Sequence, residues 1–68
     1  MRIKLNGTDT DVQPGTALVA LLERFDIKPD TDGIAVAVNE TVVPRRAWQT
    51  HTLENGDVVE IIRAVQGG

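Results

Sequence analysis

The chain opens with a strict alternation of apolar and polar positions. Met1, Ile3 and Leu5 are apolar, and the residues between them are charged. Because successive side chains of a strand point to opposite faces, this period of two predicts a half-buried strand. Asn6-Gly7 follows, and both residue types tolerate the positive φ angles of a type I′ turn. The segment therefore predicts a β-hairpin.

The return run of this hairpin, residues 8–12, alternates threonine and valine with aspartate. Charged side chains discourage pairing with other chains, which is typical of a strand at the edge of a sheet. Asp9 and Asp11 share one face of the run, as a pair of catalytic carboxylates can. No apolar residues surround them to raise a pKa, so we interpret both as solvated surface residues.

Helical spacing replaces the alternation after Pro14-Gly15. Thr16 is placed to cap the first turn of a helix. Apolar residues then recur at i, i+3, i+4 and i+7, which predicts an amphipathic helix of about three turns. These residues are Leu18, Leu21, Leu22 and Phe25. We expect them to form half of the core, because the sequence offers no second helix to cover a sheet.

Two strongly apolar runs predict the central strands. Residues 34–38 are apolar on both faces, which favours an interior position in the sheet. Residues 58–65 are rich in β-branched side chains and follow the turn signal of residues 55–57. Between these runs, Asn39-Glu40 predicts a turn and Val42-Val43 a short strand. Trp48 is expected to lie as a lid over an edge of the core.

The order of hairpin, helix, strand, short strand and final strand predicts an α+β fold. One main helix would cover one face of a mixed sheet of four to five strands. A right-handed crossover would place the final strand beside the first, which is the β-grasp (ubiquitin-like) arrangement. We expect the β-grasp domain to occupy residues 1–65 and a flexible tail to occupy residues 66–68.

The final strand predicts a candidate docking surface for partner proteins. If Val59 and Ile61 face the helix, Val58 and Ile62 lie on the open face of the sheet beside Glu60. Uncovered apolar surface of this kind marks interaction sites, although scattered surface hydrophobes are an equal alternative. Arg45 is a further candidate, because its guanidinium can contact acidic groups of a partner.

The composition of the chain argues against several classes of function. The 68 residues carry a formal net charge of −3, which argues against nucleic acid as a partner. No run is long enough to span a membrane, and the charged N-terminus lacks the apolar core of a signal peptide, so we expect a cytoplasmic protein. Without cysteine, a phosphate-binding glycine-rich loop or a nucleophile beside a base, the chain is not expected to be an enzyme. No cofactor or metal site is indicated, since His51 has no partner at metal-ligand spacing.

The chain ends in Gln66-Gly67-Gly68, directly after its strongest strand. Glycine has no side chain, so such a tail can thread a channel that excludes other residues. A terminal carboxylate is a poor electrophile and reacts only after activation, for instance by ATP on another protein. The functional interpretation is a presented substrate; the alternative is a tail without a role.

These features together resemble the ThiS family of thiamine-biosynthesis sulfur carriers, within the ubiquitin-like β-grasp superfamily. The resemblance covers essentially the whole chain and is carried by Ala37-Val38-Asn39, Val43-Pro44-Arg45 with Trp48, Gly56-Asp57-x-Val59-Glu60-Ile61 and Gly67-Gly68. It implies that the Gly68 carboxylate is adenylated by an ATP-using activating enzyme and converted to a thiocarboxylate with sulfur from a persulfide donor. The sulfur would pass to thiazole synthase, and Gln66 and Gly67 would thread into the partners' active sites.

Other carriers stay open at this point. The small subunit of molybdopterin synthase is similar, but it is usually longer and often has Pro-Pro before its Gly-Gly, where this chain has Arg63-Ala64-Val65. Carriers for tRNA thiolation, and a β-grasp module that binds partners non-covalently, are the remaining alternatives.

Overall fold

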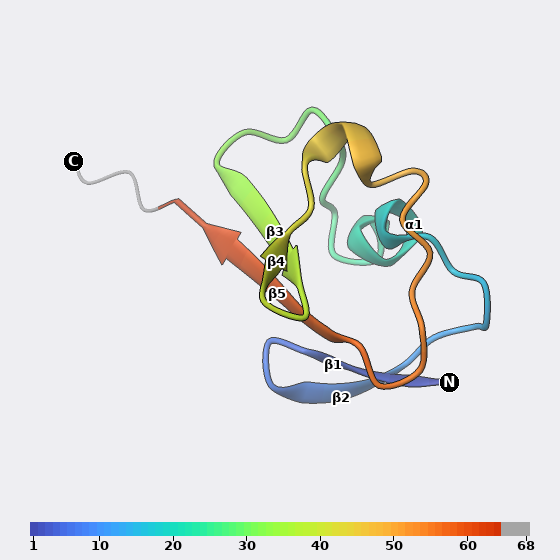
Figure 1. The fold of residues 1–68 in the computed structure, drawn as a ribbon. Coiled ribbons are helices and arrows are strands. Elements are labelled where there is room, and N and C mark those ends of the chain that lie inside the picture. Colours follow the sequence, from blue (N-terminus) through green and yellow to red (C-terminus); the bar gives the residue numbers. More distant parts are fainter. Residues whose placement is uncertain (65–68) are drawn as a thin grey trace.

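The fold consists of a curved mixed sheet and one main helix (Figure 1). The computed structural model describes residues 1–64, and residues 65–68 lie outside its described part. The elements in chain order are β1 (Arg2–Leu5), β2 (Thr8–Asp11), α1 (Leu18–Glu23), β3 (Ile34–Val38), β4 (Thr41–Val42), the 3₁₀ helix η1 (Arg45–Ala47) and β5 (Val58–Arg63).

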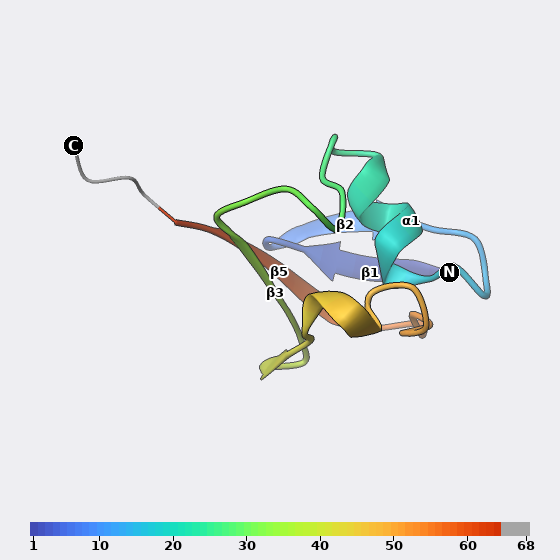
Figure 2. The same cartoon turned by 90° about the horizontal axis from the view of Figure 1, so that it is seen from above.

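The strands form a five-stranded sheet in the order β2-β1-β5-β3-β4. The final strand β5 is therefore central: it runs parallel to β1 and antiparallel to β3. The helix covers one face of this sheet (Figure 2). The predicted α+β fold with a β-grasp arrangement is confirmed, including the crossover that places the last strand beside the first.

Two hairpins with two-residue turns flank β5. Asn6 and Gly7 have φ angles of 47° and 83°, and they join Leu5 to its partner Thr8. Asn39 and Glu40 have φ angles of 51° and 69° in the turn between β3 and β4. Positive φ at both central positions is the signature of a type I′ turn, whose twist matches that of the strands. Both predicted turns are confirmed.

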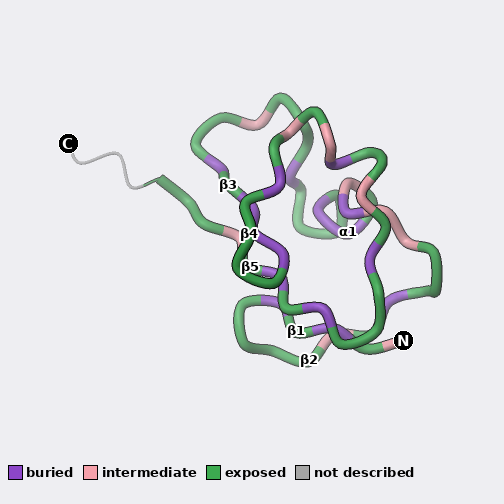
Figure 3. Tube along the Cα trace, viewed as in Figure 1, coloured by how far each residue is buried: buried purple, intermediate pink, exposed green. Residues whose placement is uncertain are grey.

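The core lies between α1 and the helix side of the sheet, as the buried segments of Figure 3 show. Leu18, Leu21 and Leu22 are completely buried against Val36 and Val59, which are also completely buried. The half-buried strand and the three leucines of the amphipathic helix thus pack as predicted.

The helix is shorter than predicted and begins differently. It spans six residues, its N-cap position is held by Ala17, and no side chain caps it. Thr16 instead donates its hydroxyl to the carbonyl of Gln13 at 2.6 Å. The first amide groups of a helix need acceptors. Here the Leu18 N–H donates to the His51 carbonyl at 2.8 Å, a partner that only the tertiary fold supplies.

The other end of the helix corrects the prediction for Phe25. Asp26 adopts a φ of 61°, and the Ile27 N–H donates to the Leu22 carbonyl at 3.1 Å. Together with the bond from the Asp26 N–H to the Glu23 carbonyl, this is the Schellman pattern that ends helices. The turn brings Ile27 into the core at 1% exposure and leaves Phe25 44% exposed.

Trp48 is a core residue rather than a lid. Its side chain is 1% exposed, and its Nε1–H donates to the Val43 carbonyl at 3.0 Å. The Arg45 guanidinium lies over the ring, with Cζ 5.2 Å from the ring centroid. Arg45 is thus the lid, and Trp48 is what it covers.

Candidate functional site

The candidate site is the C-terminal end of the chain, and β5 leads into it. The Ala64 N–H still donates to the Gly33 carbonyl at 2.7 Å, so the sheet holds the chain on the β3 side up to this residue. The end of β5 lies at the margin of the molecule, remote from α1 (Figures 1 and 2). The predicted site residues Gln66, Gly67 and Gly68 lie outside the described residues.

On its β1 side, β5 is held by the side chain of Asn6, for which the sequence predicted only a turn. The regular pairing of β1 with β5 stops at Leu5 and Val59. Asn6 then accepts a hydrogen bond on Oδ1 from the Ile61 N–H at 2.8 Å and donates Nδ2 to the Ile61 carbonyl at 3.4 Å. The amide of Asn6 therefore extends the parallel ladder toward the chain end.

A second asparagine holds the beginning of β5. Asn39 accepts the Val58 N–H on Oδ1 at 2.9 Å and donates Nδ2 to Asp57 Oδ1 at 2.9 Å. The other oxygen of Asp57 accepts the Glu54 N–H at 2.8 Å, and Asp57 is only 8% exposed. This network explains why an Ala-Val-Asn segment and a Gly-Asp segment occur together in the sequence: they meet across the sheet.

We expect Asp57→Asn to destabilise the fold by about 1–3 kcal/mol, because an amide presents a donor where both carboxylate oxygens now accept. Urea unfolding followed by circular dichroism measures the change. Asp9→Asn on the exposed edge strand is the matched control and should be nearly silent. Equal stability of the Asp57 and Asp9 variants would contradict the structural role of the network.

We expect Asn6→Gly to speed hydrogen exchange of the Ile61 amide proton, because glycine keeps the turn but removes the acceptor. The loss in stability should be about 0.5–1.5 kcal/mol, since water can reach the freed groups. Asn39→Gly is the matched control in the same turn type, and it should speed exchange at Val58 instead. Unchanged exchange at Ile61 in the Asn6 variant would show that the amide does not hold β5.

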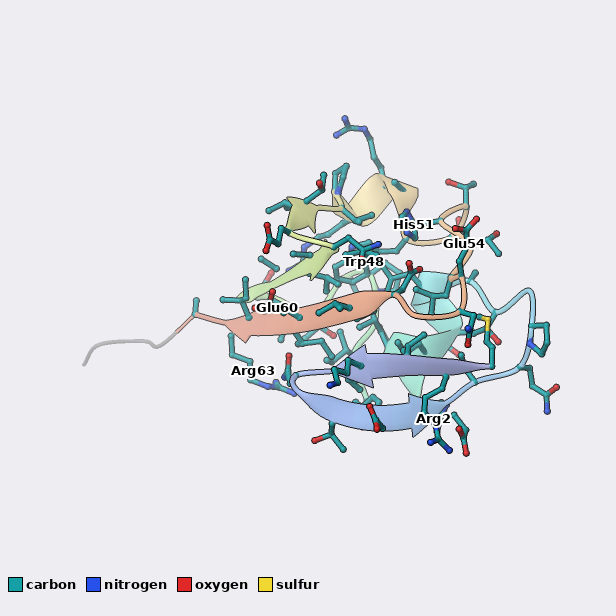
Figure 4. All side chains as sticks on the ribbon, turned by 60° about the horizontal axis from the view of Figure 1, so that its bottom comes forward. Arg2, Trp48, His51, Glu54, Glu60 and Arg63 are labelled. Atoms are coloured by element: carbon teal, nitrogen blue, oxygen red, sulfur yellow. The ribbon has the colours of Figure 1, made fainter. Side chains whose placement is uncertain are left out.

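The face of the sheet opposite the helix carries the predicted docking residues. Val58 is 40% exposed and Ile62 51% exposed, and Glu60 between them is also exposed (Figure 4). Two small residues lie beside them on β3, because Ala35 pairs with Ile62 and Ala37 with Glu60. We call Val58, Glu60 and Ile62 the open-face patch. Their predicted exposure is confirmed, and their docking role stays a prediction.

Arg45 is engaged by its own chain. Its guanidinium donates to the carbonyls of Pro29 at 2.9 Å and Ile34 at 2.8 Å, and it is half-buried over Trp48. It lines a shallow hollow together with Ile62 near the end of β5. The structure thus gives Arg45 a bracing role and places it beside the open-face patch, where contact with a partner stays a prediction.

Titratable groups form no catalytic constellation in the described part of the chain. Asp9 and Asp11 are exposed as expected, and Asp11 accepts a hydrogen bond from Arg2 Nε at 3.1 Å. This contact raises the pKa of the Arg2 guanidinium, first through the hydrogen bond and then through the carboxylate charge. Within residues 1–64, no three metal-ligating side chains are grouped around one point. Nor is any helix in this range long and apolar enough to cross a membrane.

Comparison with known proteins supplies the family. The sequence model of the ThiS family matches residues 3–68. The sulfur carrier protein ThiS of Escherichia coli K12 is 31% identical over 68 residues, which cover all of both chains. A thiazole synthase of Magnetococcus marinus is 32% identical over the whole of this chain, which spans 20% of that longer protein.

The structural comparison agrees with the sequence match. The crystal structure of a thiamine biosynthesis protein, ThiS, from Geobacter metallireducens superposes with a TM-score of 0.82 at 26% identity. The superposition covers all of both chains. Fold, length and sequence therefore lead to one family, and the chain belongs to the ThiS family.

Proposed function

We propose that this chain is a sulfur carrier of thiamine biosynthesis, which delivers sulfur for the thiazole ring from a thiocarboxylate at Gly68. The observation that supports this most strongly is the family match, which extends to the last residue of the chain. The described residues 1–64 support it, because they form a small β-grasp fold whose central strand β5 is the last element before the chain end. We take residues 1–65 as the carrier domain and residues 66–68 as its tail. The chain acts as a carrier and not as an enzyme.

The chemistry takes place on the partners. On an activating enzyme, an oxygen of the Gly68 carboxylate attacks the α-phosphorus of ATP, and pyrophosphate leaves. The terminal sulfur of a persulfide donor then attacks the acyl carbon, and AMP leaves. A thiolate then attacks the donor's sulfur in the resulting acyl disulfide, so that the thiocarboxylate leaves and a disulfide forms between the thiol and the donor. ATP is bound by the activating enzyme, and the carrier itself binds no cofactor.

Three partners follow from this reaction sequence: the activating enzyme, the persulfide donor and thiazole synthase. The thiazole synthase of Magnetococcus marinus includes a region similar to this chain in one longer polypeptide. Joining of the two sequences supports the view that carrier and synthase act together. Neither a nucleic acid nor a membrane is needed, and we place the protein in the cytoplasm.

Docking energy has to come from the folded domain, because a tail of two glycines offers few contacts. We assign docking to the open-face patch, with Arg45 at its border. In this patch the exposed side chains of Val58 and Ile62 lie on either side of the Glu60 carboxylate. A partner surface with an apolar centre and a cation would therefore fit the patch.

Incubation with the cognate activating enzyme, ATP and a persulfide donor tests the proposal. Mass spectrometry of the intact chain should show one oxygen replaced by sulfur, and fragmentation should place the exchange at Gly68. Deletion of the gene should cause a requirement for the thiazole part of thiamine. Absence of the exchange, or a requirement for molybdopterin instead of thiazole, would overturn the proposed function.

A further inference from the structure

A groove lies on the helix side of the sheet, at the end where β5 leaves the domain. Its volume is about 300 Å³, and its walls include Leu5, Thr8, Phe25, Ile61 and Arg63. We call it the helix-face groove. It exists because α1 ends at Glu23 and therefore leaves this end of the sheet uncovered (Figure 2). It faces away from the open-face patch, so the two surfaces lie on opposite faces of β5.

Phe25 gives the groove an exposed aromatic side chain. A phenylalanine in step with the leucines of α1 is expected in the core, yet Phe25 is 44% exposed at the rim of the groove. The half-buried Ile61 and, at the floor, the buried Leu5 supply further apolar wall. Grouped apolar side chains of this size at the surface mark sites where another chain packs, and aromatic residues often anchor such sites.

Arg63 adds a charge to the apolar wall. It lies two positions after Ile61 on β5, so both side chains project to the helix side of the sheet. Figure 4 shows Arg63 at the end of β5, on the side that faces the β1–β2 hairpin. Among the described carboxylates, none lies within ion-pair distance of its guanidinium. The Arg63 guanidinium is therefore available to an acidic group of a partner.

The backbone at Arg63 can also form hydrogen bonds with a chain that binds in the groove. The Ala64 N–H donates to Gly33 of the neighbouring segment, and peptide groups alternate in direction along an antiparallel pair. The N–H and carbonyl of Arg63 consequently point to the other side. There β1 has already ended at Leu5, and the Asn6 amide reaches only to Ile61. An extended peptide can pair with an exposed strand edge of this kind.

We propose that the helix-face groove binds an extended segment of an enzyme that acts on the C-terminus of this chain. The segment presents an apolar side chain to Phe25 and Ile61 and a carboxylate to Arg63. Gly68 follows Arg63 by five residues, which an extended chain spans in roughly 17 Å. An enzyme seated in the groove therefore has the tail within reach of its active site. This inference rests on the proposed sulfur-carrier function and adds a second docking surface to it.

Calorimetric titration of the full chain with the cognate activating enzyme, and separately with thiazole synthase, tests the proposal. Phe25→Ala and Arg63→Ala should each weaken binding to at least one enzyme by about tenfold or more. Phe25→Leu keeps an apolar contact and should retain most of the affinity. Arg46→Ala removes an exposed cation outside the groove and is the matched charge control. Thermal unfolding of each variant verifies that the domain is intact, which the exposure of Phe25 leads us to expect.

Wild-type affinity of both groove variants for both enzymes would overturn the proposal. Analytical ultracentrifugation, which measures the oligomeric state, is a second test. If the wild type forms dimers that Phe25→Ala dissociates, the groove is an interface between copies of this chain and the proposal fails. Thiocarboxylate formation on the wild type is measured in parallel. If the wild type forms no thiocarboxylate, the proposed function is wrong. If it forms the thiocarboxylate and the groove variants bind both enzymes normally, only the proposed role of the groove is wrong.

Discussion

Extension of the chain by one alanine after Gly68 is expected to abolish formation of the thiocarboxylate. The proposed reaction requires the carboxylate of Gly68 to reach the α-phosphate of ATP through a channel on the partner enzyme. One added residue displaces the reactive carbon by roughly 3.3–3.6 Å and places a methyl group where the tail has none. A displacement of about 1 Å already costs a factor near 10² in well-positioned reactions, so the rate should fall at least a hundredfold.

Single-turnover adenylation with the cognate activating enzyme measures this effect, with mass spectrometry as the readout of each species. The control is the stability of the domain, because the added residue lies beyond the described fold and should leave the unfolding midpoint unchanged. Binding of the extended chain to the enzyme should persist, since docking depends on the folded surfaces. An extended chain that acquires sulfur at the wild-type rate, without trimming of the alanine, would refute a role for Gly68.

Much of the sheet could be predicted because its signals are local. The alternation in residues 1–5, the two type I′ turns and the β-branched run of β5 each specify structure within a few neighbouring residues. An interior position of β3 was predicted from its apolar residues on both faces, and β3 does lie between β5 and β4 in the sheet. From these elements the strand order follows by the handedness of the crossover.

The errors concern residues whose partners are distant in sequence. The α1 amides are satisfied by carbonyls of residues 48 and 51, so Thr16 was not needed as a cap. The helix ended early because Asp26, and not a glycine, adopts the left-handed conformation, a choice that a helical pattern does not reveal. Phe25 was consequently assigned to the core.

In the candidate site, too, local features could be predicted from the sequence and contacts between distant residues could not. The exposure of Val58 and Ile62 followed from the period of two in β5. The two asparagine contacts with β5 did not, because in sequence Asn6 and Asn39 are only favourable turn residues. Their amides reach backbone groups 55 and 19 residues away, and only the strand order brings these together.

Replacement of Trp48 by alanine is expected to have the largest effect on stability. Trp48 is 1% exposed, and loss of a buried aromatic side chain typically costs about 3–5 kcal/mol. Small domains have roughly 0.05–0.15 kcal/mol of stability per residue, which is about 3–10 kcal/mol for 68 residues. The truncation therefore removes a large part of the total stability, and a substantial unfolded population should appear at room temperature.

The position of Trp48 explains why no other element compensates for its loss. Its indole N–H bonds the Val43 carbonyl, its own carbonyl accepts the Val19 N–H of α1, and Arg45 packs over its ring. The side chain thereby joins the segment after β4 to η1, and its backbone holds the start of the helix. Alanine keeps the backbone bond but leaves a cavity, an unpaired Val43 carbonyl and an Arg45 without its aromatic partner.

Urea unfolding followed by circular dichroism distinguishes these contributions, with Trp48→Phe as the matched variant. Phenylalanine retains most of the buried volume and the ring beneath Arg45 but lacks the N–H donor, so its cost should be about 1–3 kcal/mol. The difference between the two variants then reports the cavity. If alanine costs no more than phenylalanine, the ring is not an essential part of the core, and Arg45 would have no buried partner to brace it beside the strand that presents the chain end.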